Sequence, residues 1–211
     1  MFLEVFPTGP IQANCTLLGD ENELVIIDPG EEAERIVDRI KASGLAPKMI
    51  LHTHGHMDHA GGTGRLHQLL AGELPVGLHR DDVPLYEKLT MQAQMFGLEV
   101  DDGPDPDLWL EHLDVLKVGN LEIEVRHTPG HSPGSVCFVV KNEGLVVVGD
   151  VLFAGSIGRT DLWGGSIEVL EESIRSQLYS LPDDTRVITG HGPETTIGRE
   201  KRTNPFVRFA G

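Results

Sequence analysis

A cluster of histidines is the first feature of this 211-residue chain that could do chemistry. Residues 52–59 read His-Thr-His-Gly-His-Met-Asp-His and hold four of the ten histidines. Imidazole is the commonest protein ligand for zinc and similar metals. Protonated histidines this close together repel one another, so an ordered cluster requires a metal or strong hydrogen-bond partners. The apolar residues 49–51 precede the cluster, so we expect it at the end of a strand, where α/β folds place their chemistry.

Three further potential metal ligands lie later in the chain. His131, Asp150 and His191 each follow a strand-like run and come directly after a glycine. Glycine lets the backbone turn sharply and brings the next side chain inward. Such a repeated arrangement is uncommon among independent surface residues, so we expect these side chains to meet the histidine cluster.

Together these positions supply enough ligands for two divalent metal ions. Two such ions about 3.5–4 Å apart can share an aspartate and a hydroxide. His54 and His56 point the same way if their segment is extended, whereas Asp58 and His59 come one turn later, where a helix can begin. We therefore predict two groups of three ligands and one bridging carboxylate: His54, His56 and His131; Asp58, His59 and His191; and Asp150.

The rest of the chain supplies elements that position these residues. Helices are predicted at residues 31–43, 61–71, 81–96 and 166–181, and residues 97–112 are predicted to be a loop. The order of strands, helix, strand and helix occurs once in each half, which predicts an α/β fold of two stacked sheets with helices outside. Strands are predicted at residues 2–6, 14–18, 23–28, 49–52, 76–79, 115–118, 121–127, 136–141, 145–149 and 186–189.

The charge balance excludes some classes of partner. The chain has 17 basic and 33 acidic residues, a net charge of −16, which disfavours nucleic acids and anionic membranes. An anionic substrate would need a local cluster of cations. No stretch is apolar enough to span a bilayer, and the N-terminus lacks signal-peptide features. We therefore expect a cytoplasmic protein, with Cys15 and Cys137 as buried thiols.

The pattern His-x-His-x-Asp-His, followed by separate His, Asp and His residues at strand ends, resembles the metallo-β-lactamase-fold superfamily. The resemblance runs over nearly the whole chain and implies a single domain over residues 1–211. It implies a four-layer αββα sandwich of two mixed sheets with the dinuclear site at one edge, and the same division of the seven ligands. The bridging position of Asp150 argues against antibiotic hydrolysis, because true β-lactamases tend to place a cysteine there or lack a bridging carboxylate.

Within the superfamily, residues 128–135 and 149–153 are similar to glyoxalase II, the hydroxyacylglutathione hydrolases. Residues 158–162, 190–196 and 204–206 resemble a short bacterial branch without the full helical C-terminal region. The resemblance implies hydrolysis of a glutathione thioester such as S-lactoylglutathione by a hydroxide that bridges two metals. Zinc, iron and manganese all accept such ligands. In that scheme Asp58 also orients the nucleophile, and Asp150 holds the two ions together.

Three cations are candidates for binding the substrate. Arg159 aligns with the position where glyoxalase II places a cation against the glutathione carboxylate, and Lys201 and Arg202 are further candidates. Alternatively, Arg159 pairs with Asp161, and the other two are solvated surface charges. Residues 91–96 include Met91, Met95 and Phe96, which we expect to pack in the core rather than line a substrate entrance.

Two alternative functions remain open at this stage. Persulfide dioxygenases of the same fold share a Gly-Arg-Thr-Asp motif like residues 158–161 and use one iron held by two His and one carboxylate. A complete second ligand set favours the hydrolase over this mononuclear oxidoreductase. A metal-bound binding module without turnover is the other alternative. The expected partner is a small-molecule thioester, and the oligomeric state is not readable.

Overall fold

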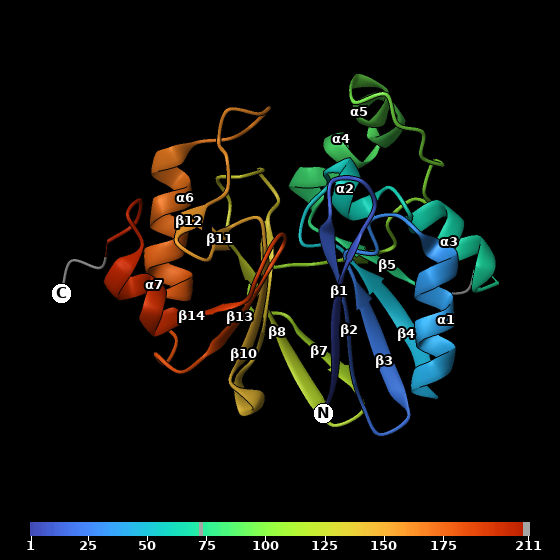
Figure 1. Ribbon diagram of the computed structural model, residues 1–211, viewed down its shortest axis with the longest axis horizontal. Helices are drawn as coiled ribbons and strands as arrows, with labels where there is room; N and C mark the ends of the chain where they lie inside the picture. The colour runs from blue at the N-terminus through green and yellow to red at the C-terminus, as the bar shows by residue number, and fades with distance from the viewer. Residues whose placement is uncertain (72–73, 209–211) are drawn as a thin grey trace.

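Two mixed sheets form the centre of the computed structural model, which describes residues 1–71 and 74–208 (Figure 1). The first sheet pairs its first three strands antiparallel and the rest parallel, in the order β1 (Phe2–Thr8), β2 (Ala13–Asp20), β3 (Glu23–Ile27), β4 (Ala46–Leu51), β5 (Val76–Leu78) and β6 (Leu108–Trp109). The second is antiparallel except for its β10–β13 pair, in the order β14 (Thr195–Thr196), β13 (Arg186–Thr189), β10 (Leu145–Gly149), β9 (Val136–Val140), β8 (Leu121–His127) and β7 (Val115–Val118).

The strands alternate their side chains between two cores, as the two-residue period of an extended chain requires. In β3, Val25 and Ile27 pack in a core shared with residues of the second sheet, whereas Leu24 and Ile26 face the helices. Phe138 of β9 joins the shared core and is fully buried. Strands buried on both faces are therefore nearly continuous in hydrophobicity, which made them readable in the sequence.

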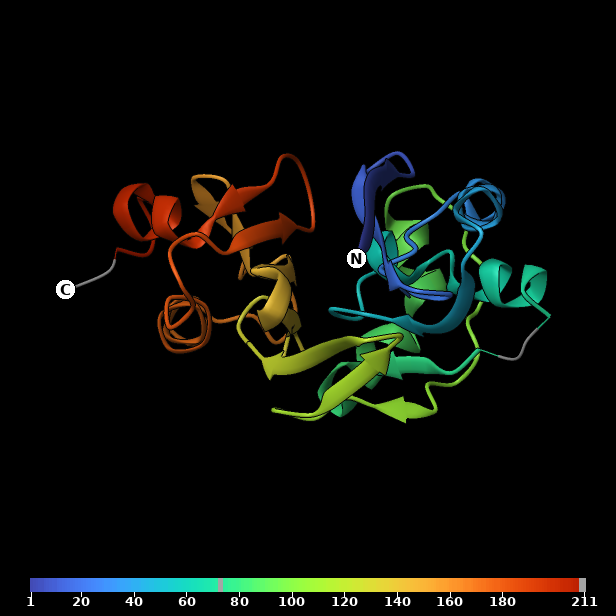
Figure 2. The ribbon, with the colours of Figure 1, turned by 90° about the horizontal axis from the view of Figure 1, so that it is seen from below.

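Helices cover the outer face of each sheet (Figure 2). On the first sheet lie α1 (Ala33–Ser43) and α3 (Thr63–Leu69), and on the second lie α6 (Ile167–Ser173), continued by a π-helical turn η3 (Ile174–Leu178), and α7 (Ile197–Thr203). This arrangement confirms the predicted layers of helix, sheet, sheet and helix. Among the described residues, no helix is long and apolar enough to cross a membrane.

Several local predictions differ from the structure. The helix expected at 81–96 is three short pieces, η1 (Arg80–Asp82), α4 (Val83–Tyr86) and α5 (Leu89–Met95). Pro84 accounts for the first boundary, because it cannot continue a helix from η1 and instead starts α4. The expected loop at 97–112 contains β6, and a 3₁₀ turn, η2 (Lys141–Glu143), joins β9 to β10. The short strands β11 (Leu152–Phe153), β12 (Ser156–Ile157) and β14 and the helix α7 were not predicted.

The prediction that Met91, Met95 and Phe96 pack in the core is wrong. Helix α5 buries Leu89 and Ala93, which lie four residues apart on one face. The three larger side chains lie outside that face and are each more than half exposed. A seven-residue helix at the edge of the fold offers only one narrow face to the core.

Candidate metal centre

The histidine cluster leaves the end of β4, as predicted. Residues 52–56 are irregular, and α2 (Met57–Ala60) begins directly after them, so Asp58 and His59 stand on a short helix. The segment passes close to its neighbours, since a Cβ on Gly55 would press against the backbone of Asp82 and Tyr86. The sequence therefore needs a glycine in the middle of the cluster.

Three histidines form the first group, which we call the first triad. His54, His56 and His131 each bring one ring nitrogen within 4.8 Å of the others, and all three are buried. His56 Nδ1 lies 3.0 Å from His131 Nε2. His131 reaches this point from the turn after β8, where Gly130 has a φ of +129° and packs directly on the backbone of Leu170. An L side chain at position 130 would be strained and would collide with α6.

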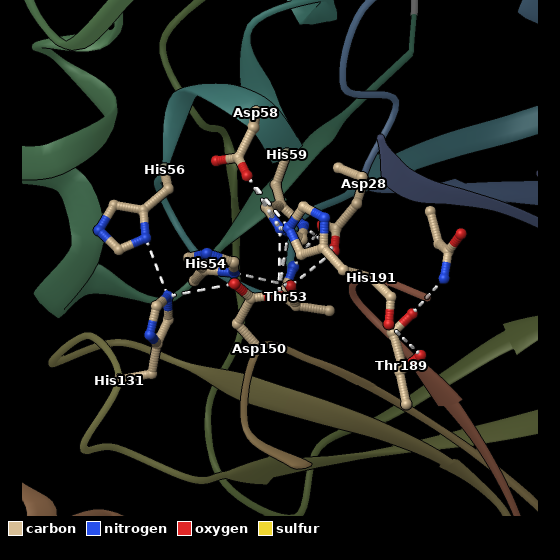
Figure 3. A network of polar contacts seen from close by, with 12 residues as sticks. Asp28, Thr53, His54, His56, Asp58, His59, His131, Asp150, Thr189 and His191 are labelled. Atoms are coloured by element: carbon tan, nitrogen blue, oxygen red, sulfur yellow. Dashed lines mark hydrogen bonds and ion pairs between the residues drawn. The ribbon is translucent and has the colours of Figure 1, made fainter. Parts of the chain in front are cut away.

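Asp58, His59 and His191 form the second triad on the other side of the centre (Figure 3). His191 Nε2 lies 3.1 Å from Asp58 Oδ2 and 3.3 Å from His59 Nε2. His191 follows β13, whose end is tied to the start of β2: the Asn14 amide group donates to the backbone oxygen of Thr189. The second triad is therefore assembled from both sheets.

Asp150 lies between the two triads. Its Oδ2 is 3.6 Å from His131 Nε2 of the first triad, and its Oδ1 is 3.3 Å from His59 Nε2 and 3.7 Å from His191 Nε2 of the second. A Cβ on Gly190 would overlap Asp150 Oδ1, so glycine there leaves room for the carboxylate. One oxygen thus faces each triad, which is the arrangement that a bridging ligand requires.

Hydrogen bonds fix which nitrogen the first triad presents. His131 Nδ1 lies 2.8 Å from the carbonyl oxygen of Arg159, which can only accept, so Nδ1 donates to it and Nε2 is the nitrogen left to bind a metal. Thr53 Oγ1 lies 3.0 Å from His54 Nδ1. Because that hydroxyl donates to a carboxylate, it accepts from Nδ1–H, and His54 Nε2 is left for a metal.

Asp28 is a buried residue of the site that the sequence reasoning missed. Its Oδ1 accepts from the backbone N–H of Thr53 at 2.8 Å, and its Oδ2 accepts from Thr53 Oγ1 at 2.6 Å and faces His59 Nδ1 at 3.0 Å. It therefore orients one histidine of each triad, His59 directly and His54 through Thr53. The sequence predicts Asp28 as the last residue of a strand, but its φ of +50° places it in a turn, which the following Pro29-Gly30 indicates.

Asp82 is the second carboxylate that was missed. It accepts from the backbone N–H groups of Gly55 at 2.8 Å and Gly134 at 2.6 Å, and from Ser132 Oγ at 2.7 Å. These donors belong to the two loops that carry the first triad. Asp82 is fully buried, and burial raises its pKa even though these hydrogen bonds oppose the shift. Nothing in its sequence context, an expected helix, distinguished it from a surface acid.

The charges of the two triads differ. Burial and then the neighbouring histidines lower the pKa of His54 well below its usual value, and burial followed by His131 lowers the pKa of His56 to about 4. Burial alone would also lower the pKa of His59, but Asp150, Asp58 and Asp28 outweigh it and raise that pKa. Burial thus favours the neutral form of His54 and His56, whereas the carboxylates around His59 favour positive charge there.

These features fit a pair of metal ions. In each triad two ring nitrogens face each other at 3.0–3.3 Å, an arrangement that a shared cation would stabilise. His54 Nε2 is buried without a hydrogen-bond partner in the part of the chain that the structure describes, and an orphaned buried nitrogen is costly unless something binds it. The donor set of imidazoles and carboxylates suits zinc, iron and manganese.

A cavity of about 330 Å³ opens over the centre. Its lining includes Arg159 and residues of both triads, together with Ile11, Met57, Gln92, Phe96 and Leu162. Arg159 forms two hydrogen bonds to Asp161, at 2.7 and 2.8 Å, so the alternative pairing predicted for it is present. Lys201 and Arg202 are not among the described residues that line the cavity. Both contact Asp183, and their helix α7 lies on the outer side of the second sheet (Figure 1).

The other histidines contribute outside the triads. His52 is buried, with its Nε2 3.2 Å from Thr63 Oγ1, and burial lowers its pKa to about 4. His127 stacks on His79 with ring centroids 4.1 Å apart, and its Nε2 donates to the carbonyl oxygen of Pro133 in the loop of His131. His52 therefore lies in the packing beside the cluster, and His127 supports the loop of a proposed ligand.

Similarity to known proteins shows the family of this chain. A family model described as the metallo-beta-lactamase superfamily matches residues 8–191, so the chain belongs to that superfamily and has the fold of a metallo-hydrolase. The hydroxyacylglutathione hydrolase GloC of Haemophilus influenzae is 44% identical over 98% of this chain and 98% of its own length.

Two solved structures are similar over nearly the whole chain. TTHA1623 in a di-iron-bound form has a TM-score of 0.89 and 42% identity, covering 98% of this chain and 100% of that chain. The BLEG-1 B3 metallo-beta-lactamase has a TM-score of 0.90 and 38% identity, covering 100% of both chains. These similarities establish the fold, and the substrate has to be inferred from the residues of the site.

Proposed function

We propose that this protein is a dinuclear metal-dependent hydrolase that cleaves a glutathione thioester such as S-lactoylglutathione. The observation that carries the proposal is Asp150, whose two oxygens face two complete triads. The similarity to the hydrolase GloC supports the thioester assignment, and the di-iron form of TTHA1623 supports a pair of metals. Zinc and iron are the metals we expect.

The residues of the site have distinct tasks in this proposal. Two bound cations would lower the pKa of a shared water and polarise the thioester carbonyl. Asp58, whose Oδ2 already faces His191, would orient the attacking water and accept its hydrogen bond. The conjugate thiol of the leaving group has a pKa of about 8.5, so the thiolate departs without a strong acid.

Arg159 is the cation that we propose for the carrier part of the substrate. It lines the cavity, and its guanidinium is exposed and already paired with Asp161. A substrate carboxylate would compete with Asp161 for the same fork of donors. Lys201 and Arg202, which pair with Asp183 on the second half, remain proposals for more distant contacts.

The test is an assay beside elemental analysis of the same preparation. Protein loaded with zinc, iron or manganese is offered S-lactoylglutathione, a cephalosporin and, under oxygen, glutathione persulfide. We expect two metals per chain and cleavage of the thioester. One iron per chain with oxygen uptake would instead establish a dioxygenase, and preferred opening of the cephalosporin a lactamase like BLEG-1. His54→Ala should abolish turnover, and His67→Ala, a histidine on α3 outside both triads, is the matched control.

A further inference from the structure

Large apolar side chains surround the opening of the metal centre. Ile11, Phe96 and Leu162 all line the cavity and are 37%, 65% and 39% exposed. They come from three separate segments: the β1–β2 turn, the end of α5 and the loop after β12. Exposing apolar surface to water costs about 25 cal/mol per Å². A collar of such residues around a reactive site is therefore a place where an apolar ligand group would be stabilised.

Two of the three collar residues, Phe96 and Ile11, lie on a different half of the molecule from the cation, whereas Leu162 lies in the same loop as Arg159. Phe96 follows α5 and Ile11 follows β1, and both elements belong to the first half, whereas Arg159 lies in the second half beyond β12 (Figure 1). A thioester with its carbonyl over Asp150 would extend its two ends toward opposite sides. The end that carries a carboxylate would go to Arg159, which leaves the acyl end for Phe96 and Ile11.

Little on the acyl side would recognise a hydroxyl group. Gln92 is the amide side chain in the lining of the cavity, and it already forms hydrogen bonds within the protein. Its Oε1 accepts from the backbone N–H of Met57 at 3.2 Å, and its Nε2 donates to the carbonyl oxygen of Leu85 at 2.8 Å. A hydroxyacyl group would gain less here than an alkyl group of similar size.

We infer that the preferred acyl group is an unbranched apolar chain longer than lactoyl, held against Phe96 and Ile11. This inference rests on the proposed thioester hydrolysis and specifies its substrate class. Each methylene that is fully buried contributes about 0.8 kcal/mol, or close to fourfold in kcat/KM. The four methylenes that separate hexanoyl from acetyl would thus raise kcat/KM at least about tenfold even when partly buried.

The experiment is a chain-length series on the metal-loaded protein, with acetyl, lactoyl, butyryl and hexanoyl thioesters of glutathione. We expect kcat/KM to rise from acetyl to hexanoyl, with lactoyl below butyryl. Phe96→Ala and Ile11→Ala should flatten the series by lowering the ratio of hexanoyl to acetyl hydrolysis about fivefold or more. Met95→Ala is the matched control, because this neighbour on α5 is 79% exposed and lies outside the cavity lining.

The outcomes separate this inference from the proposed function. A flat series with efficient cleavage of every thioester, or a series unchanged by Phe96→Ala and Ile11→Ala, overturns the acyl assignment and leaves thioester hydrolysis intact. In a second series the acyl group stays acetyl and the thiol is lengthened instead. If kcat/KM depended on the length of the thiol alone, the collar would bind the carrier, and the inference would be overturned. Failure to cleave any thioester with both metals present overturns the proposed function, and this inference with it.

Discussion

The two triads of the metal centre differ in charge, access and support. The first consists of three buried histidines and contains no carboxylate. The second contains a carboxylate, and its Asp58 and His191 side chains are 18% and 25% exposed beside the cavity. A ligand set with a carboxylate and greater exposure suits the exchange of water and substrate, whereas a buried set of imidazoles suits a cation that stays in place.

The supports of the two triads differ as well. The Asp82 carboxylate accepts hydrogen bonds from the two loops that carry the first triad, through Gly55, Ser132 and Gly134. Asp28 contacts His59 of the second triad and, through Thr53, His54 of the first. Asp82 therefore supports a single triad, whereas Asp28 links both, and substitutions at each position should separate these roles.

Removal of the bridge should have the largest effect, because Asp150 is the residue that faces both triads. Asp150→Ala is expected to lower thioester hydrolysis about 10³-fold and to weaken both metals, since it removes charge stabilisation worth several kcal/mol from the centre. Activity and metal content per chain are the measurements. Asp183→Ala, which changes a carboxylate on the outer side, is the control. Retention of two tightly held metals in Asp150→Ala would contradict the bridging role.

Loss of a single ligand should remove one of the two metals from the centre. His56→Ala removes a ligand of the first triad and His191→Ala one of the second, so each variant should keep one metal of two and lose more than about 100-fold in activity. Metal titration followed by elemental analysis checks this. If both variants lost both metals, the triads would be one cooperative site and the contrast between them would fail.

Substitution of the supporting carboxylates should have an intermediate effect. Residues that orient metal ligands typically contribute about 10- to 100-fold to metal affinity. Asp82→Asn is therefore expected to weaken one of two metals by that factor, whereas Asp28→Asn should weaken both. Competition with a chelator measures the two affinities. Circular dichroism of each variant shows whether folding has been retained. Equal weakening of both metals in Asp82→Asn would contradict the proposal that Asp82 supports the first triad alone.

The smallest effect is expected at the cavity entrance. Arg159→Ala should raise KM for a glutathione thioester about fivefold with little change in kcat, because an exposed cation contributes only modestly to the free energy of substrate binding. Lys201→Ala is the comparison, since its ammonium group contacts Asp183 and the carbonyl oxygen of Leu181. Steady-state kinetics provide the measurement. A larger KM change in Lys201→Ala than in Arg159→Ala would show that the carrier binds on the α7 side.

Much of the architecture was predictable because it depends on local patterns. The buried strands β9 and β10 are unbroken apolar runs, and α1 places Ile36, Val37 and Ile40 on one face before Gly44 ends it. Elements whose stability comes from distant partners were not predictable. The two-residue strands β6 and β14 exist only because a neighbouring strand pairs with them, and Pro84 divided a helix that periodicity alone had predicted whole.

The sequence by itself determined the kinds and spacing of the seven candidate ligands, because histidine, aspartate and glycine at strand ends carry their chemistry in any context. That these residues bind metal in the proposed division stays a prediction. The tertiary structure alone decided the roles of Asp28 and Asp82, because a carboxylate becomes a support only when donors far apart in the chain converge on it. It also decided that Phe96 opens onto the cavity, since burial depends on what packs beside a residue and not on its type.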